Sequence, residues 1–351
     1  MTTANFLIVG QGVAGSVLAW TLDQLGCRVV VADAPNLPSA SGVAAGIVNP
    51  LTGRKLVRTW RADELFPFLH NFYRDVESKQ SASFFHPLPI YRPYRSLAEK
   101  ADYETFTAHP SVAKYVNQAV DNQYYESVIN NPFGGLEVAQ SGWLNVNGFV
   151  ESIRTYFQKK NQFIPAEVVV KALIINKNSV QWNGVSFQKI LFCDGTHARE
   201  NSLFDWLPYN VVKGQILTAR VAHYPIKNIV NQGVFILPVN DSTIRIGATY
   251  SWHDVDWETT TDGRAFLEAK VRAVLKIPYE IIGQSAGIRP ATKDRRPFIG
   301  IHPVYSSVGI FGGFGSKGVS LSPYLAHQFA GHLLEGKDLD AEVNIQRCLS
   351  L

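Results

Sequence analysis

The chain has 351 residues, of which 46% are hydrophobic and 18% charged, a balance typical of folded globular proteins and not of disordered ones. Its net charge of +4 is too small to require a nucleic-acid partner, and its three widely separated cysteines form no CxxC pair or His/Cys cluster. We therefore expect no metal site, no membrane span and a reducing, cytoplasmic compartment.

The first 33 residues follow the order strand, glycine turn, helix, strand, acid. The apolar run Phe6–Val9 leads into the turn, and apolar positions then recur at helical spacing over residues 13–25. A second apolar run, residues 28–32, ends at Asp33. This order is that of a dinucleotide-binding unit, although a glycine-rich turn without a ligand would have the same local residues.

Each glycine of the turn has a mechanical role in such a unit. Gly10 permits the tight bend, Gly12 lets the backbone approach a pyrophosphate, and Gly15 lets the helix pack closely against the strand. The N–H groups and the dipole at the start of the helix would receive the phosphates. Asp33 would accept hydrogen bonds from ribose hydroxyls, and its charge would repel the 2′-phosphate of NADP.

The segment after Asp33 is a loop of small residues, unlike the next strand of a simple dehydrogenase. Residues 41–46, SGVAAG, present almost no side chain, so a large flat ligand could lie against their backbone. A flexible surface loop would have the same composition. The loop continues into a basic run that belongs either to the solvated start of a helix or to a site for an acidic or larger substrate, namely Arg54, Lys55, Arg58 and Arg61.

The middle of the chain predicts alternating helices and strands. One helix carries Phe149, Ile153 and Phe157 on a single face. Two strands, Gly233–Val239 and Thr243–Thr249, are followed by an amphipathic helix near Asp262–Leu275.

The C-terminal part contains a second glycine turn. The motif GIRPATKDRRPFIG, residues 287–300, precedes the strand-like run Val308–Phe311. The turn GGFGSKG, residues 312–318, then opens a helix that runs to Leu334. A glycine turn at a helix N-terminus is again a place for an anion or a dipole.

Four motifs in this order resemble those of the FAD-dependent amino acid and amine oxidases, typified by D-amino acid oxidase, glycine oxidase and sarcosine oxidase. They are GQGVAG with its acid, SGVAAGIVNP, GIRPATKDRRPFIG and GGFGSKGVSLSP. Weaker matches between these motifs extend the resemblance over nearly the whole chain; they are VVVKALI, LFCDGTHA, VVKGQIL and GVFILPVNDSTIRIGATY. The resemblance implies an α/β plus α+β fold. A Rossmann-like FAD-binding domain (1–80, 140–212 and 288–351) would be interleaved with an antiparallel-sheet substrate domain (81–139 and 213–287).

The resemblance also implies FAD as the cofactor. The flavin should be bound non-covalently, because no cysteine stands near GIRPATKD, where sarcosine oxidases carry their covalent link. The first turn would hold the pyrophosphate, the small-residue loop would lie along the flavin, and the last turn would hold the pyrimidine end. The implied cofactor residues are Gly10, Gly12, Val13, Ala14, Gly15, Asp33, Ser41, Gly42, Ala45, Gly46, Ile47, Val170, Gly195, Gly313, Phe314, Gly315, Ser316, Lys317, Gly318 and Val319.

Arg289 matches the family arginine that grips the carboxylate of an amino acid substrate. A planar guanidinium suits this task because it makes two parallel charge-assisted hydrogen bonds, but Arg289 could instead pair with Asp294 across the turn. Tyr250 is either a pocket wall or part of the core. Ser316 stands where glycine oxidase has a second arginine, which predicts a weaker hold on a small free amino acid.

The implied reaction oxidises the C–N bond of a small amino acid or secondary amine. The α-hydrogen passes as hydride to flavin N5 and the imine is then hydrolysed, so no general base is needed. The electron acceptor would be oxygen or another molecule. Composition and motifs leave the particular amine, its stereochemistry and the oligomeric state open.

Two other functions are compatible with the sequence. The chain also resembles the oxidase half of the bifunctional enzyme that trims a carboxymethylaminomethyl group on tRNA wobble uridine. These residues include no methyltransferase domain, however, and a charge of +4 is a weak signature of RNA binding. A flavin-binding protein without amine oxidase turnover is the third possibility.

Overall fold

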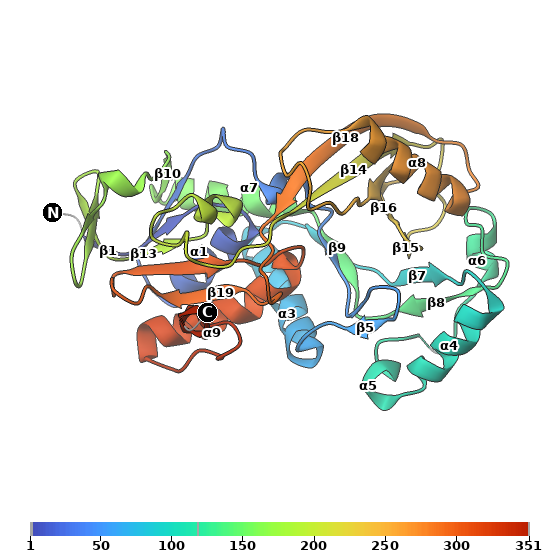
Figure 1. Ribbon diagram of the computed structural model, residues 1–351, viewed down its shortest axis with the longest axis horizontal. Helices are drawn as coiled ribbons and strands as arrows, with labels where there is room; N and C mark the ends of the chain where they lie inside the picture. The colour runs from blue at the N-terminus through green and yellow to red at the C-terminus, as the bar shows by residue number, and fades with distance from the viewer. Residues whose placement is uncertain (1–2, 118, 350–351) are drawn as a thin grey trace.

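The computed structural model describes residues 3–117 and 119–349. It places a mostly parallel sheet beside an antiparallel sheet in an elongated molecule (Figure 1). Residues 1–2, 118 and 350–351, which the predicted domain pieces include, lie outside the described part of the chain.

The mostly parallel sheet is covered on both faces, as its apolar strands require. Ile8 and Val31 belong to one hydrophobic cluster, and Leu7 and Val30 to another on the opposite face. In order across the sheet the strands are β10 (Phe163–Pro165), β2 (Val29–Asp33), β1 (Thr3–Val9), β13 (Val185–Phe192), β12 (Val180–Trp182) and β11 (Ile174–Ile175), with β20 (Val308–Gly312) beside β13 and β19 (Phe298–Ile301) beside β20.

Four long helices share the first of these clusters with the sheet. They are α1 (Val13–Gln24), α3 (Ala62–Gln80), α7 (Val146–Lys159) and α9 (Gly318–Glu335). Phe149, Ile153 and Phe157 are all fully buried, so the amphipathic face predicted for α7 is confirmed. The second cluster is closed by the short helices η1 (Val170–Ala172), η2 (Gly195–Arg199) and η3 (Ile345–Cys348) and the segments next to them.

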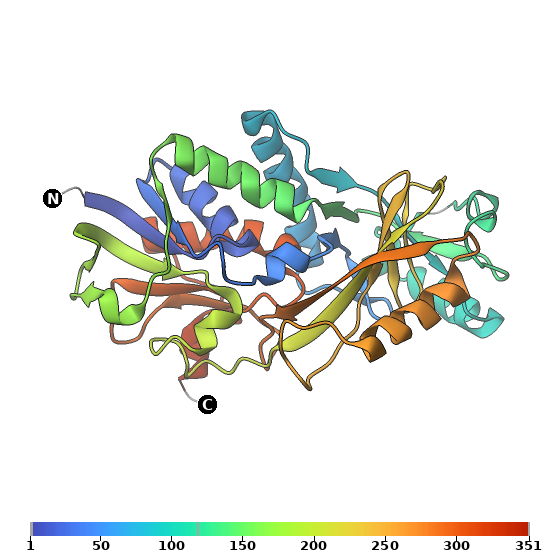
Figure 2. The same cartoon turned by 90° about the horizontal axis from the view of Figure 1, so that it is seen from above.

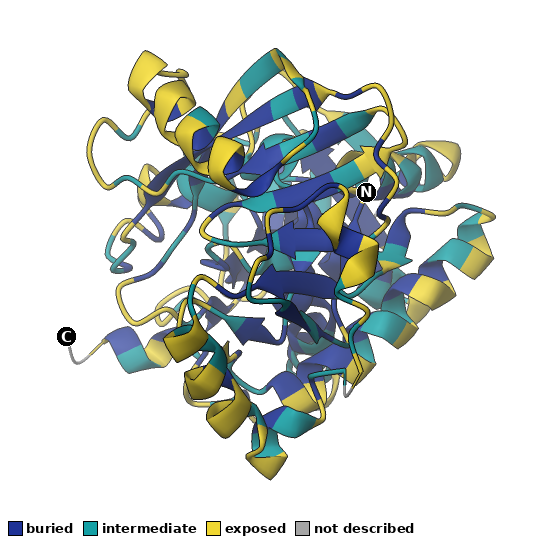
Figure 3. Ribbon diagram, turned by 90° about the vertical axis from the view of Figure 1, so that its right-hand side faces the viewer, coloured by how far each residue is buried: buried dark blue, intermediate teal, exposed yellow. Residues whose placement is uncertain are grey.

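The antiparallel sheet forms the other side of the molecule. Its order is β18 (Glu280–Arg289), β14 (Val212–Arg220), β17 (Thr243–Gly247), β16 (Phe235–Asn240), β15 (Ile229–Asn231), β7 (Ile90–Pro93) and β8 (Gly135–Val138). Leu267 and Val271 of α8 (Thr261–Val274) pack on this sheet, and the helix turns its other face to solvent (Figure 3). The long strands β14 and β18 reach the junction of the two sheets, where Val212 pairs with Arg289 (Figure 2).

Smaller elements connect the sheets. They are the strands β3 (Ile47–Val48), β9 (Gly142–Leu144), β6 (Phe85–Pro87), β4 (Leu51–Thr52) and β5 (Val57–Arg58), and the helices α2 (Ala40–Val43), α4 (Leu97–Thr107), α5 (Pro110–Ala113) and α6 (Gln123–Glu126).

The elements predicted from periodicity are present, with two strands whose bounds differ. The strand predicted over Gly233–Val239 spans Phe235–Asn240 as β16. The strand expected over Thr243–Thr249 ends at Gly247 as β17. Thr249 still contacts Gln215 of β14. Its hydroxyl accepts a hydrogen bond from the backbone N–H of Gln215 at 2.8 Å, and its own N–H donates to the carbonyl oxygen of Gln215 at 3.2 Å, so a side chain replaces one of the two backbone acceptors. The fold class is as predicted. The strands of the antiparallel sheet come from residues 90–138 and 212–289, and the domain boundaries stay a prediction.

Candidate active site

A cavity of about 1100 Å³ lies along the carboxyl ends of β1, β2 and β13 and extends to the junction of the two sheets. Its walls come from the first glycine turn, the small-residue loop, residues 166–171, the start of α9 and the ends of β14 and β18. Ligands of open α/β sheets bind at this edge, because the helix N-termini meet there.

The first glycine turn is compressed against β13, so only glycine fits. Gly10 has φ +90°, and a Cβ on it would lie 2.8 Å from the carbonyl oxygen of Cys193. A Cβ on Gly15 would lie 1.9 Å from the carbonyl oxygen of Gly10. The backbone N–H of Val13, at the start of α1, donates to the hydroxyl of Ser41 at 3.0 Å. The helix therefore presents its positive end to the cavity.

The acid at the end of β2 is held by two donors. Asp33 Oδ1 accepts from the backbone N–H of Gln11 at 2.9 Å, and Oδ2 accepts from Arg154 Nη2 at 3.3 Å. Arg154 lies on α7, which the sequence did not connect with the turn. Its positive charge opposes the negative charge of Asp33, so repulsion of a 2′-phosphate is weaker than the sequence alone predicted.

The small-residue loop is fixed by β9 and by the antiparallel sheet. Gly46 has φ +73°, and a Cβ there would lie 2.0 Å from the carbonyl oxygen of Leu144. Arg245 of β17 donates to the carbonyl oxygens of Ala44 at 2.8 Å and Val43 at 2.5 Å. These contacts hold the backbone of the loop along the cavity wall, unlike the flexible surface loop that its composition also allowed.

The second glycine turn lies at the junction of the sheets. Gly313 has φ +73°, and a Cβ there would lie 2.8 Å from Thr292 Cγ2. The N–H of Gly315 donates to the carbonyl oxygen of Pro290 at 2.9 Å, which ties the turn to the end of β18. The side chain of Lys317 extends to the hydroxyl of Thr59 at 3.3 Å, and burial lowers the pKa of its amine.

Arg289, at the end of β18, brings a guanidinium to the same junction. It donates to the carbonyl oxygens of Lys213 at 3.3 Å and Thr249 at 3.2 Å, and it lies 5.2 Å from the centre of the Tyr250 ring. A Cβ on Gly214 would lie 2.1 Å from Arg289 Nη2, so that glycine makes room for the guanidinium.

No carboxylate compensates the charge of Arg289 within residues 3–117 and 119–349. Burial instead lowers the pKa of its guanidinium. The alternative pairing with Asp294 is wrong, because Asp294 Oδ2 pairs with Arg347 Nε at 2.8 Å. A partly buried guanidinium that makes hydrogen bonds to carbonyl oxygens but has no counter-ion is suited to receive a carboxylate ligand.

Asp194, directly after β13, is a buried acid that the sequence did not single out. Burial raises the pKa of its carboxyl to about 6, against the opposing effect of a hydrogen bond with Asn201. Its Oδ1 has no hydrogen-bond partner among the described residues. Because the folded pKa is raised, this group's contribution to stability is complete below the ordinary value of 3.8 and is lost as the pH rises through 6.

Most residues assigned from the sequence come together around the cavity. Those in its lining are Gly10, Gly12, Val13, Ala14, Asp33, Ser41, Gly42, Ala45, Gly46, Ile47, Val170, Gly195, Gly313, Phe314, Gly315, Ser316, Gly318, Val319 and Arg289. Gly15, Lys317 and Tyr250 are not part of the lining that the described residues form, and Tyr250 is 58% exposed. Sequence reasoning missed many other lining residues, among them Gln11, Arg154, Asp194 and Gly214.

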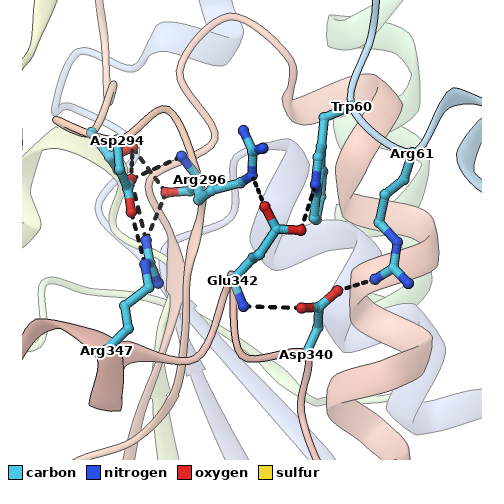
Figure 4. A network of polar contacts seen from close by, with 8 residues as sticks. Trp60, Arg61, Asp294, Arg296, Asp340, Glu342 and Arg347 are labelled. Carbon is cyan, nitrogen blue, oxygen red and sulfur yellow. Dashed lines mark hydrogen bonds and ion pairs between the residues drawn. The ribbon is translucent and has the colours of Figure 1, made fainter.

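Half of the basic run is used in structural ion pairs. Arg58 pairs with Asp63 at 3.1 Å, and Arg61 pairs with Asp340 and with Glu64. Figure 4 shows Arg61 within a polar network that joins the start of α3 to the C-terminal segment. The network continues through Trp60, Arg296, Glu342, Arg347 and Asp294.

Arg54 and Lys55 lie exposed between β4 and β5. Tyr103 and Arg92 hold the backbone of this hairpin through the carbonyl oxygens of Arg54 and Gly53.

The residues present fit a dinucleotide. The turn has no room for side chains, because a Cβ on Gly10 would lie 2.8 Å from the carbonyl oxygen of Cys193 and one on Gly12 would lie 2.8 Å from Ser41 Oγ. Two helix N-termini face the cavity, and Asp33 stands at the end of β2. Fold and site together define a dinucleotide-binding protein whose long cavity extends to the guanidinium of Arg289. The chain belongs to the FAD dependent oxidoreductase family, whose pattern matches residues 5–331. The prediction of FAD as cofactor is thereby confirmed, while its non-covalent attachment stays a prediction.

Known relatives span the whole chain. It is 24% identical over 351 residues to the bifunctional protein ThiO/ThiG of Trichormus variabilis, with 95% of this chain and 53% of that protein covered. It is 22% identical over 370 residues to the tRNA 5-methylaminomethyl-2-thiouridine biosynthesis bifunctional protein MnmC of Legionella pneumophila, with 93% and 53% covered. The chain thus spans about half the length of these relatives.

The fold is similar to that of solved oxidases. The crystal structure of glycine oxidase from Geobacillus kaustophilus superposes with a TM-score of 0.79 at 19% identity, covering 97% of this chain and 96% of that one. Among the described residues, none of the helices combines the length and apolar character needed to cross a membrane. The cytoplasmic location stays a prediction.

Proposed function

We propose that this chain oxidises the C–N bond of an amine that carries a carboxylate, either a small amino acid or a secondary amine. One observation carries the proposal. Arg289 offers its guanidinium to the cavity with no carboxylate of the described residues beside it. A carboxylate ligand would supply the missing counter-charge and accept two parallel hydrogen bonds.

The surrounding residues suit orientation of such a substrate. Ile216 and Phe235 give the cavity apolar surface, and Gly318 and Val319 from the first turn of α9 line the same cavity. FAD bound in the cavity supplies the two-electron acceptor for the hydrogen on the α-carbon. The protein's share is to hold the carboxylate at Arg289, to direct the amine-bearing carbon toward the flavin and to exclude water.

The direct test is the visible spectrum of the holoenzyme under anaerobic conditions. We expect the oxidised flavin bands to bleach after addition of one member of a panel of glycine, sarcosine, D-amino acids and N-carboxymethyl amines. The matching amine without the carboxylate, such as methylamine for glycine, should bleach the bands far more slowly. Equal bleaching by both would refute the role given to Arg289, and bands that no amine bleaches would refute amine oxidation.

A second candidate is oxidation of a carboxymethylaminomethyl group carried on RNA. It is supported by the likeness to MnmC over 93% of this chain, and it needs the same carboxylate grip. Pairing of Arg58 and Arg61 with acids leaves less free positive charge for a nucleic acid than the sequence implied. Bleaching by a modified tRNA, but not by the free N-carboxymethyl amines, would favour this candidate.

A further inference from the structure

Helix α7 is bonded to the first glycine turn through two side chains. Gln11, in the middle of the turn, is only 2% exposed, and its amide donates to the carbonyl oxygen of Val150 at 3.1 Å. The amide oxygen of Gln11 accepts from Arg154 Nε at 2.8 Å. Arg154 Nη2 then reaches Asp33 Oδ2 at 3.3 Å, so turn, helix and acid form one network.

The guanidinium of Arg154 is held in one orientation. Glu151 accepts from Nη1 at 3.2 Å, and the ring centre of Phe163 lies 5.6 Å from the guanidinium carbon. Both Arg154 and Asp33 keep a minority of their side-chain surface exposed, 24% and 20%, and both line the cavity. A guanidinium carries five N–H groups, and its hydrogen bonds to described residues use three of them.

This arrangement decides how the acid acts on a ligand. Each oxygen of the Asp33 carboxylate already accepts one hydrogen bond, and each keeps a lone pair for a further donor. Because Arg154 offsets the charge, the pair would recognise a ribose hydroxyl mainly through hydrogen bonds and not through the charge of the acid alone. Without Arg154, the backbone N–H of Gln11 would be the one remaining donor among the described residues that orients the carboxylate.

We infer that Arg154 is a positioning residue for the cofactor. It fixes the Asp33 carboxylate toward the adenosine ribose of FAD, and with Gln11 it couples the cofactor turn to α7. The inference concerns the cofactor end of the cavity and holds whichever amine is oxidised. Its test needs no substrate, so its outcome is separate from that of the proposed function.

The first experiment measures release of FAD from the full-length holoenzyme after dilution, followed by the rise of flavin fluorescence. We expect Arg154→Met to weaken FAD binding about tenfold or more, the effect of losing a hydrogen bond to a charged group. Arg154→Lys should recover part of the loss because it restores the charge. The matched control is Lys160→Met. It removes the ion pair that joins the residue directly after α7 to Asp23 of α1, outside the cavity lining.

A second readout separates positioning from a general loss of stability. The full-length chain is equilibrated with equal concentrations of FAD and an FAD analogue that lacks the adenosine 2′-hydroxyl, and the bound ratio is measured. The unaltered protein should prefer FAD, whereas Arg154→Met and Asp33→Asn should each lose most of that preference. The double variant should show the same preference for FAD over the analogue as Asp33→Asn alone, since the two residues act as one unit.

Two results would overturn the inference. One is FAD release from Arg154→Met that is as slow as from Lys160→Met. The other is an unchanged preference for FAD over the analogue in Arg154→Met, which would mean that Arg154 only supports the fold.

Discussion

Replacement of Arg289 by methionine is the most direct perturbation of the substrate end of the cavity. The change removes the charge and the planar donor fork but keeps an unbranched side chain of similar reach. FAD should stay bound, because the cofactor cradle at Gly10 and the loop at Gly46 owe their shape to backbone contacts far from this side chain. The expected defect therefore lies in substrate binding and orientation.

The magnitude follows from the pairing of charges. Loss of one partner from a buried ion pair costs about 2–5 kcal/mol, which is about 30-fold to several thousandfold in kcat/KM. The partly buried Arg289 also donates to two carbonyl oxygens, which keep it oriented before a substrate arrives. Arg289→Lys keeps the charge, so its kcat/KM should fall less than that of Arg289→Met. It should still fall below the wild-type value, because a single ammonium group cannot replace the two parallel donors of the guanidinium.

The assay is anaerobic flavin reduction over a range of concentrations of the amine that bleaches the wild-type holoenzyme. Arg220→Met is the matched control, since it removes an arginine that pairs with Glu280 at the exposed end of the same two strands. Reduction by Arg289→Met at the rate of Arg220→Met, with FAD fully bound in both, would refute the carboxylate grip.

Three further outcomes follow from particular contacts. Asp194→Asn should gain about 2 kcal/mol of stability relative to wild type between pH 4 and 7, because the carboxyl, with its pKa of about 6 in the folded protein, ionises over that range. Urea unfolding of the holoenzyme at both pH values would show no such gain if Asp194 were solvated. Gly214→Ala should fold and bind FAD but displace Arg289, whose Nη2 lies 2.1 Å from the added Cβ position, so its KM for the amine should rise; an unchanged KM would count against this geometry. Arg61→Met should lower the free energy of unfolding by about 1 kcal/mol, because it loses the ion pair with Asp340, and it should leave flavin reduction unchanged. Slower flavin reduction at full FAD occupancy would instead indicate that the basic run belongs to the substrate site.

The sequence alone determined the cofactor-binding unit because all of its parts are local. Strand, turn and helix succeed one another within 25 residues, and the helical spacing of apolar residues predicted α1, in which Val17, Leu18 and Leu22 are buried. The glycines are required by backbone conformation and by close approach of neighbouring backbone, as at Gly10, so residue type carries the information directly. The predicted elements of the antiparallel sheet followed from alternation in the same way.

Only the tertiary structure decided which charges meet. Asp294 could have paired with Arg289, five residues away, but it bonds to Arg347, 53 residues further along the chain. Arg61 pairs with Asp340, and Asp33 with Arg154 on a helix 121 residues away. Hydrogen bonds and ion pairs depend on a few ångströms between side chains, and those distances are set by the packing of helices and sheets that are far apart in sequence. The sequence therefore identified a cofactor turn and a candidate arginine. The fold placed no carboxylate of the described residues beside that arginine, and it joined α7 to the turn.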